Sequence, residues 1–280
     1  MLHRRSGVRL AGLLSAPLAW LLIAYLGSLA VLLVSAFWTT DVFTGQVVHR
    51  FTLDNFRTLL TTGVYRDVAI RTIGVAAAVT VVCAAIGFPM AFFMAKVASR
   101  RAQRALIVAI LTPLWASYLV KAFAWRVMLL QGGVVDWLGG PIGVHSPGFG
   151  ITAVVIVLSY LWLPYMILPI YAGLERLPDS LVEASADLGA KSGRTFRSVV
   201  LPLAWPAVVA GSIFTFSLSL GDYITVQIVG GKSQMLGNLI YTNIGAANNL
   251  PLAAALASIP VVVMVCYLLI VRRSGALDSL

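Results

Sequence analysis

Charged residues are scarce in this sequence of 280 residues, in which Asp, Glu, Lys and Arg together make up 11% and only 10 residues are acidic. Ordinary soluble domains carry about 25% charged residues. So few charges cannot cover the surface of a soluble globule of this size, whereas a surface that faces lipid needs none. The composition therefore excludes a soluble enzyme, and it excludes a disordered chain, which is poor in apolar residues.

Cysteine and histidine are also scarce. The two cysteines, Cys83 and Cys266, both lie in apolar runs and are interpreted as small core residues rather than as a disulfide or a metal pair. An intramembrane hydrolase needs a buried nucleophile with a base. The three histidines, His3, His49 and His145, lie in the N-terminal tail or in predicted outer loops. The sequence therefore predicts no catalytic residue, no metal site and no cofactor in this chain.

Apolar residues are abundant, at 60% of the sequence, with a mean hydropathy of +0.93. They form long runs without charge, and about 20 helical residues are enough to cross the hydrocarbon core of a bilayer. We therefore expect an all-α, multi-pass membrane protein with six transmembrane helices in one domain over residues 1–280. The predicted spans are residues 13–38, 67–95, 105–130, 151–173, 206–229 and 251–271.

The basic residues that flank these spans predict the orientation, because Lys and Arg are enriched in cytoplasmic loops. With both termini in the cytoplasm, thirteen of the 20 basic residues lie inside and four lie outside. The inner group is Arg4, Arg5, Arg9, Lys96, Arg100, Arg101, Arg104, Arg176, Lys191, Arg194, Arg197, Arg272 and Arg273. The outer group is Arg50, Arg57, Arg66 and Lys232. The basic residues occur in short clusters between apolar runs, and this distribution favours a membrane topology over nucleic-acid binding.

The longest predicted cytoplasmic segment, residues 175–205, is the place where a soluble partner would bind. Ser180 and Glu183 have the spacing of a capping box, which predicts a short helix that begins there. Leu181, Ala184 and Leu188 share one face of that helix. Gly189 follows at the position where a helix commonly ends with a residue in the left-handed backbone conformation. We expect a second short helix after this bend, ended by Pro202 and Pro206 before the fifth span.

The same segment resembles the cytoplasmic loop of permease subunits of ABC importers, with the pattern E-A-A, three residues, G, nine residues, I-x-L-P. Ser185 stands for the second alanine and Val199 for the isoleucine. The matching positions are Glu183, Ala184, Ser185, Gly189, Val199, Leu201 and Pro202. The resemblance implies that these residues couple the chain to an ATPase.

Four further segments, residues 112–125, 160–171, 177–190 and 216–231, look like the first permease of the spermidine/putrescine group. The resemblance implies a type I importer permease in a bacterial inner membrane, surrounded by lipid and forming half of a translocation path for polyamines. Its partners would be a paralogous second permease, a cytoplasmic ABC ATPase dimer and an extracytoplasmic solute-binding protein. ATP would be bound by the ATPase subunit. Similar patterns occur in importers of iron complexes, thiamine or phosphonates, and these substrates stay open.

The substrate path is predicted from polar and aromatic residues near the outer halves of the spans. Asp222 is an isolated acid in a long apolar stretch, so it must pair, face water or bind a proton. Its pairing with Lys121 or Arg126 is one expectation, and contact with a polycation is another. The candidate path residues are Asp222, Tyr223, Trp115, Tyr118, Trp125 and Lys121. Aromatic residues at that depth are also typical of an interfacial belt.

An ion-coupled secondary transporter is the main alternative from another class, because Asp222, Lys121 and Arg126 in or beside spans could bind ions. That class does not explain the helical pair in residues 175–205. The two interpretations differ in whether uptake into vesicles requires ATP or an ion gradient.

Overall fold

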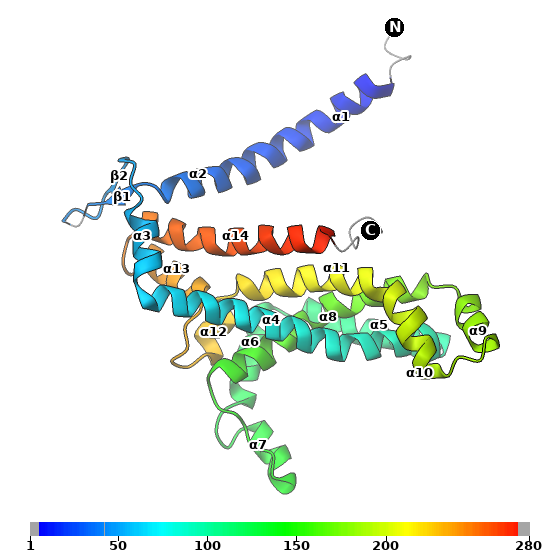
Figure 1. The fold of residues 1–280 in the computed structure, drawn as a ribbon. Coiled ribbons are helices and arrows are strands. Elements are labelled where there is room, and N and C mark those ends of the chain that lie inside the picture. Colours follow the sequence, from blue (N-terminus) through cyan, green and yellow to red (C-terminus); the bar gives the residue numbers. More distant parts are fainter. Residues whose placement is uncertain (1–5, 42, 274–280) are drawn as a thin grey trace. The chain divides into compact units, whose positions relative to one another are not determined.

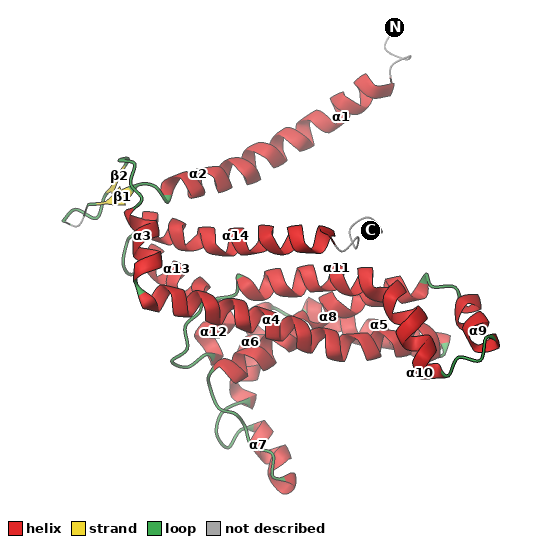
Figure 2. Ribbon diagram, in the orientation of Figure 1, coloured by secondary structure: helices red, strands yellow, loops and turns green. Residues whose placement is uncertain are grey.

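The computed structural model describes residues 6–41 and 43–273, and most of these residues are helical (Figure 2). The predicted all-α class is confirmed. Within the described residues the only strands are β1 (Thr39–Thr40) and β2 (Val47–Val48), a short antiparallel pair with Thr39 opposite Val48. The N-terminal Arg4 and Arg5, which contribute to the predicted orientation, lie outside the described residues.

The chain divides into two compact units. Unit 1 comprises Met1–Arg66 and Leu239–Ile259, and unit 2 comprises Asp67–Asn238 and Pro260–Leu280. The expectation of one transmembrane domain stays a prediction. Three helices contribute residues to both units, and these are α4 (Gly63–Phe92), α13 (Leu236–Ile244) and α14 (Leu250–Arg273).

Unit 1 begins with one continuous helix made of α1 (Ser6–Leu21), the π-helical turn η2 (Leu22–Gly27) and α2 (Ser28–Ser35). No side chain from Gly12 to Ser35 is buried in the described structure, as expected of a helix whose apolar surface faces lipid. The amide of Asn55 in α3 (Asp54–Thr61) donates 2.8 Å hydrogen bonds to the carbonyl oxygens of Ala36 and Trp38. These bonds fix the chain where the first span ends.

Unit 2 contains most of the remaining helices. After α4 they are η3 (Phe93–Val97), α5 (Arg100–Trp115), α6 (Tyr118–Met128), α7 (Val134–Gly139), η4 (Gly140–Ile142), α8 (Ile151–Glu175), α9 (Asp179–Asp187), α10 (Ser192–Thr195), η5 (Phe196–Val200), α11 (Leu201–Leu220) and α12 (Ile224–Val229). Within this unit α8 and α11 run side by side, with α9 and α10 at one end and α7 and α12 at the other (Figure 1).

Small residues allow α4, α8 and α11 to pack closely. A Cβ atom at Gly211 of α11 would lie 2.8 Å from Met166 Sδ and 3.1 Å from Met166 Cα. At Gly87 of α4 a Cβ atom would lie 3.2 Å from Met166 Cγ. Lipid tails are as apolar as the side chains, so contact between membrane helices depends on such close packing rather than on hydrophobic burial. Met166 of α8 is fully buried where the three helices meet.

Among the residues that the structure describes, five helical segments are long and apolar enough to cross a membrane: Gly12–Ser35, Gly63–Val97, Ile151–Glu175, Ser192–Leu220 and Leu250–Arg272. They overlap predicted spans one, two, four, five and six, but the segment at the fifth span, Ser192–Leu220, begins and ends earlier than the predicted bounds of 206–229. The third predicted span was expected as one helix over residues 105–130, and this was wrong. α5 and α6 instead form a pair bent by 96°. The count of six spans stays a prediction, because it requires this pair to cross as one span.

Local backbone preferences explain the bend between α5 and α6. Pro113 lacks an N–H and therefore removes one hydrogen bond from the last turn of α5. Ala116 and Ser117 are extended, with ψ angles of 141° and 137°. Ser117 occupies the position before the first helical residue of α6, where serine is favoured.

Candidate functional site

The segment of residues 175–205 folds as the predicted bent helical pair, at the end of unit 2 shown in Figure 1. Its second helix, however, does not end before the fifth span. α10 continues through η5 into α11, and Pro202 and Pro206 lie inside this continuous helix. Wide π-helical turns accommodate the bonds that proline removes from membrane helices, and η5 directly precedes α11. Val199 and Leu201 are half-buried and Pro202 is exposed on the same helix.

The start of α9 differs from the predicted capping box. The helix begins at Asp179, with Pro178 as its cap residue and no capping bond from a side chain. Ser180 therefore lies inside the first turn and cannot cap it. Asp179 places a carboxylate in the first turn, where the helix dipole favours negative charge. Glu183 is exposed on the next turn.

Gly189 ends α9 as predicted, in the left-handed conformation with φ +78°. The N–H of Gly189 donates to the Ala186 carbonyl at 2.8 Å, and the N–H of Ala190 donates to the Ser185 carbonyl at 3.1 Å. This pair of bonds is a Schellman motif, which satisfies the last carbonyls of the helix. A Cβ atom at Gly189 would meet no atom within 4 Å, so backbone strain alone disfavours a side chain there.

The inner face of α9 contacts the rest of unit 2 at a few points. The hydroxyls of Ser185 and Thr195 share a 2.9 Å hydrogen bond, and Val182 packs against the core. Serine at the position where the family pattern has alanine therefore forms a specific link to α10. A cavity of about 360 Å³ lies beside this face, with Val182 and Phe196 in its wall.

The outer face of α9 carries the predicted apolar residues. Leu181 is 44% exposed, Leu188 is 89% exposed and Ala184 is exposed between them. The expectation that these three residues share one face is consistent with their common exposure. Leu181 and Leu188 therefore give the solvent-facing side of α9 apolar surface that a partner can cover.

A second group of functional candidates lies at the other end of unit 2, where two helices are interrupted. α11 ends at Leu220 and α12 begins at Ile224, so the predicted span 206–229 is not one helix. The intervening residues include Asp222, which is 8% exposed. A buried carboxylate needs hydrogen-bond partners.

Asp222 finds its partners on α6 and α12. The hydroxyl of Tyr118, the first residue of α6, donates to Asp222 Oδ2. The backbone N–H of Thr225 donates to Asp222 Oδ1 at 2.9 Å, and the hydroxyls of Tyr118 and Thr225 lie 2.5 Å apart. The Asp222 side chain therefore joins the break in one helix to the break in the other.

Pairing of Asp222 with a base on the third span is not observed. Among the described residues, neither Lys121 nor Arg126 forms an ion pair with it. Arg126 instead donates at 2.9 Å to the Ile228 carbonyl, near the end of α12, and its guanidinium lies 5.3 Å from the centre of the Phe149 ring. Sequence reasoning missed Tyr118 as the partner because a neutral hydroxyl carries no charge signal.

The other candidate path residues have different surroundings. Trp115 ends α5 and is 91% exposed, as expected of a side chain in an interfacial belt. Trp125 packs against Tyr160, with ring centres 5.4 Å apart. The carbonyl of Tyr223 accepts a 3.1 Å hydrogen bond from Asn238. The described contacts thus bring together Tyr118 and Asp222 from the predicted set.

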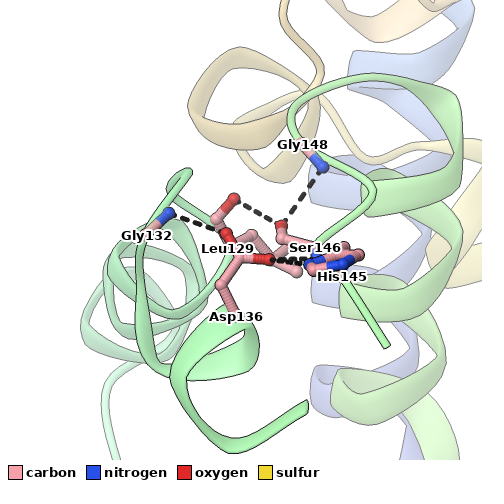
Figure 3. A network of polar contacts seen from close by, with 6 residues as sticks. All are labelled: Leu129, Gly132, Asp136, His145, Ser146 and Gly148. Carbon is pink, nitrogen blue, oxygen red and sulfur yellow. Dashed lines mark hydrogen bonds and ion pairs between the residues drawn. The ribbon is translucent and has the colours of Figure 1, made fainter. Parts of the chain in front are cut away.

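The loop before α8 is held by a polar network that the sequence did not predict (Figure 3). Asp136 accepts hydrogen bonds from the backbone N–H groups of Ser146 at 2.6 Å and Gly132 at 2.7 Å, and it lies 3.8 Å from His145 Nδ1. The bonds from Ser146 and Gly132 hold the pKa of the Asp136 carboxyl below its usual value. The Ser146 hydroxyl donates to the Leu129 carbonyl at 2.7 Å and closes the loop.

Comparison with known families identifies the chain over most of its length. Residues 85–276 match the family described as "Binding-protein-dependent transport system inner membrane component". The Escherichia coli inner membrane ABC transporter permease protein YdcU is 44% identical to this chain, and the match covers 98% of this chain and 92% of that protein. The Escherichia coli spermidine/putrescine transport system permease protein PotB is 31% identical, over 81% of this chain and 84% of that protein.

A solved structure has the same fold. The crystal structure of a bacterial alginate ABC transporter, in complex with a periplasmic protein that binds an alginate pentasaccharide, contains a chain that matches with a TM-score of 0.71. The match covers 93% of this chain and 91% of that chain, at 15% identity. At that identity the likeness shows the fold and not the substrate.

Proposed function

The chain belongs to the family of binding-protein-dependent transport system inner membrane components and is a permease subunit of an ABC importer, and on this premise we propose that it imports polyamines. The 31% identity with the spermidine/putrescine permease PotB supports this substrate class. In this proposal the chain forms half of the translocation path, beside a paralogous second permease. An extracytoplasmic solute-binding protein delivers the polyamine, and a dimer of ATPase subunits hydrolyses ATP.

One observation carries the proposed coupling to the ATPase, namely the exposed apolar face of α9. Leu181 and Leu188 offer apolar surface to a partner, while Ala184 between them leaves room for close approach. The Schellman motif at Gly189 fixes the end of the helix without using side chains on that face. Glu183 is exposed and lines the open cavity beside the inner face of α9, where its carboxylate can meet a basic residue of the ATPase.

We propose that the Tyr118–Asp222 junction lies beside the polyamine path. A carboxylate next to aromatic rings is a suitable site for a flexible polyammonium chain, because ring faces also attract cations. The junction packs the Tyr118 ring against Trp162, with centres 5.9 Å apart. In this conformation the Asp222 carboxylate is occupied by its own partners, so a polyamine must displace the Tyr118 hydroxyl to bind it.

Substitutions on α9 test the proposed coupling in the complete importer. Ala184→Trp adds bulk to the proposed contact face and should release the ATPase or abolish uptake, while capture of solute by the binding protein is unchanged. Ala247→Trp places the same ring on an exposed loop of unit 1 and serves as the matched control.

Gly189 provides a second, conformational test. Asparagine tolerates the left-handed conformation, whereas a β-branched residue does not. Gly189→Asn should therefore keep uptake and Gly189→Val should lose it. Normal ATPase co-purification and normal uptake in both Ala184→Trp and Gly189→Val would show that α9 is not the coupling element. Uptake driven by an ion gradient without ATP would favour a secondary transporter instead.

A further inference from the structure

The N-terminus of α9 is tied to the end of α4 by one lysine. Lys96 lies in η3, the π-helical turn that ends α4. Its Nζ donates a 2.6 Å hydrogen bond to Asp179 Oδ1 and another 2.6 Å bond to the Leu177 carbonyl. These two acceptors lie on either side of Pro178, so one ammonium group holds the elbow between α8 and α9.

The burial of this ion pair is asymmetric. The Lys96 side chain is 14% exposed and the Asp179 side chain is 77% exposed. Ion pairs with an exposed member contribute little to folding stability, because solvent screens them. The two 2.6 Å bonds from Lys96 Nζ nevertheless fix the position of the elbow between α8 and α9. A positional role therefore explains the arrangement better than a stabilising role does.

The cavity beside α9 explains why the contacts of Lys96 with Asp179 and Leu177 matter for the position of this helix. The cavity of about 360 Å³ opens to solvent and lies between one face of α9 and the turns η3 and η5, and both Lys96 and Asp179 contribute to its wall. A helix above a cavity can tilt without compressing a packed core. Besides the chain connection to α8 and the packing of Val182, α9 has two polar attachment points to the membrane helices, which are Lys96 at η3 and the Ser185–Thr195 bond at α10.

We propose that Lys96 is a positioning residue that transmits movement of α9 to α4 through Asp179 and the Leu177 carbonyl. This inference rests on the proposed function, in which α9 receives the movement of the ATPase. The Ser185–Thr195 bond transmits the same movement to α11. The two attachment points thus connect one docking helix to two different membrane helices.

The test measures uptake per ATP hydrolysed in the reconstituted importer, with its ATPase, second permease and binding protein. Lys96→Met and Asp179→Asn should keep ATPase co-purification and basal ATP hydrolysis. Uptake per ATP should fall about fivefold or more, the lower end of typical coupling between sites. Lys96→Arg keeps the charge and should recover most of the coupling. Asp179→Asn keeps an acceptor oxygen at the exposed position and removes its charge, so it tests the ionic part of the contact with Lys96.

The outcomes separate this inference from the proposed function. Normal uptake per ATP in Lys96→Met would overturn the role of Lys96, while loss of uptake in Ala184→Trp would still support α9 as the docking helix. Loss of ATPase co-purification in Lys96→Met would also overturn it, because Lys96 would then support docking rather than transmission. Normal co-purification and uptake in Ala184→Trp would instead reject the proposed function itself.

Discussion

The Tyr118–Asp222 junction offers the sharpest energetic prediction. Tyr118→Phe removes one hydroxyl and keeps the aromatic ring that packs against Trp162. Asp222 Oδ2 then keeps the Thr225 hydroxyl, at 3.4 Å, while Oδ1 keeps the Thr225 N–H at 2.9 Å. The carboxylate remains buried, so the loss is greater than that of an exposed hydrogen bond.

Typical hydrogen-bond energies in soluble and membrane proteins set the expected free-energy change for loss of the Tyr118 hydroxyl. Hydrogen bonds to charged groups contribute about 1.5–3 kcal/mol in soluble proteins. Hydrogen bonds between membrane helices average about 0.6 kcal/mol and reach about 1.7 kcal/mol. For a bond to a carboxylate between membrane helices we therefore expect a coupling energy of about 1–2 kcal/mol between Tyr118→Phe and Asp222→Ala.

The assay is a double-mutant cycle of unfolding free energies for the importer in bicelles, together with hydrogen exchange of the Thr225 amide. Tyr118→Phe should speed exchange of that amide, because the carboxylate that caps it loses its second anchor. Thr61→Ala removes a hydroxyl bonded within α3 and is the control, with no expected coupling to Asp222. A coupling energy near zero, with unchanged exchange at Thr225, would refute a junction between α6 and α12.

Asp222→Asn distinguishes a path role from a structural role at the same junction. The substitution keeps the size of the side chain and removes its charge. Lower polyamine flux with an unchanged melting temperature would support the path role, and a lower melting temperature with unchanged specificity would support the structural role. If flux and melting temperature both stay unchanged, Asp222 has neither role.

Three further predictions concern other parts of the chain. The pKa of Asp136 is lowered in the folded loop, so its contribution to loop stability should be fully present above the ordinary carboxyl pKa of 3.8 and should disappear as pH falls through the lower folded value. Amide protection in the loop, measured relative to the intrinsic exchange rate at each pH, that stays unchanged at such acid pH would contradict this. Gly211→Ala should lower unfolding stability by about 1–3 kcal/mol through overpacking on Met166, whereas Gly74→Ala, whose Cβ meets no atom within 4 Å, should not; equal melting temperatures would count against close α8/α11 packing. The chain reconstituted alone should neither hydrolyse ATP nor transport polyamine, and ATPase activity from it would contradict the assignment of hydrolysis to partner subunits.

The spans and the end of α9 were predictable because their signals are local. Runs without charge specify membrane helices directly, and Gly189 combines the end of a helical pattern with the residue that best adopts positive φ. The start of α9 was predicted two residues late, with Ser180 rather than Pro178 as the cap residue, because Asp179 and Ser180 are both suitable near the start of a helix. Residue type alone does not decide between such neighbours.

The breaks and the partners of buried groups could not be predicted in the same way. Prolines are common in membrane helices, and Pro206 lies in an unbroken helix while Pro113 precedes a bend of 96°. Whether a proline ends a helix depends on tertiary contacts, such as the bond from Tyr118 to Asp222 across the two breaks. The charge of Asp222 predicts a base as its partner, whereas its observed partners are a hydroxyl and a backbone N–H.

Contact between α9 of this permease and the ATPase can be measured by cross-linking from a single position. A photoreactive phenylalanine at Leu188, which is 89% exposed on the outer face of α9, should cross-link to the ATPase subunit in native membranes. The same residue at Phe123, exposed on α6 near the other end of unit 2, is the matched control and should not. A cross-link to the ATPase from Phe123, or none from Leu188 in an importer that transports normally, would contradict the account.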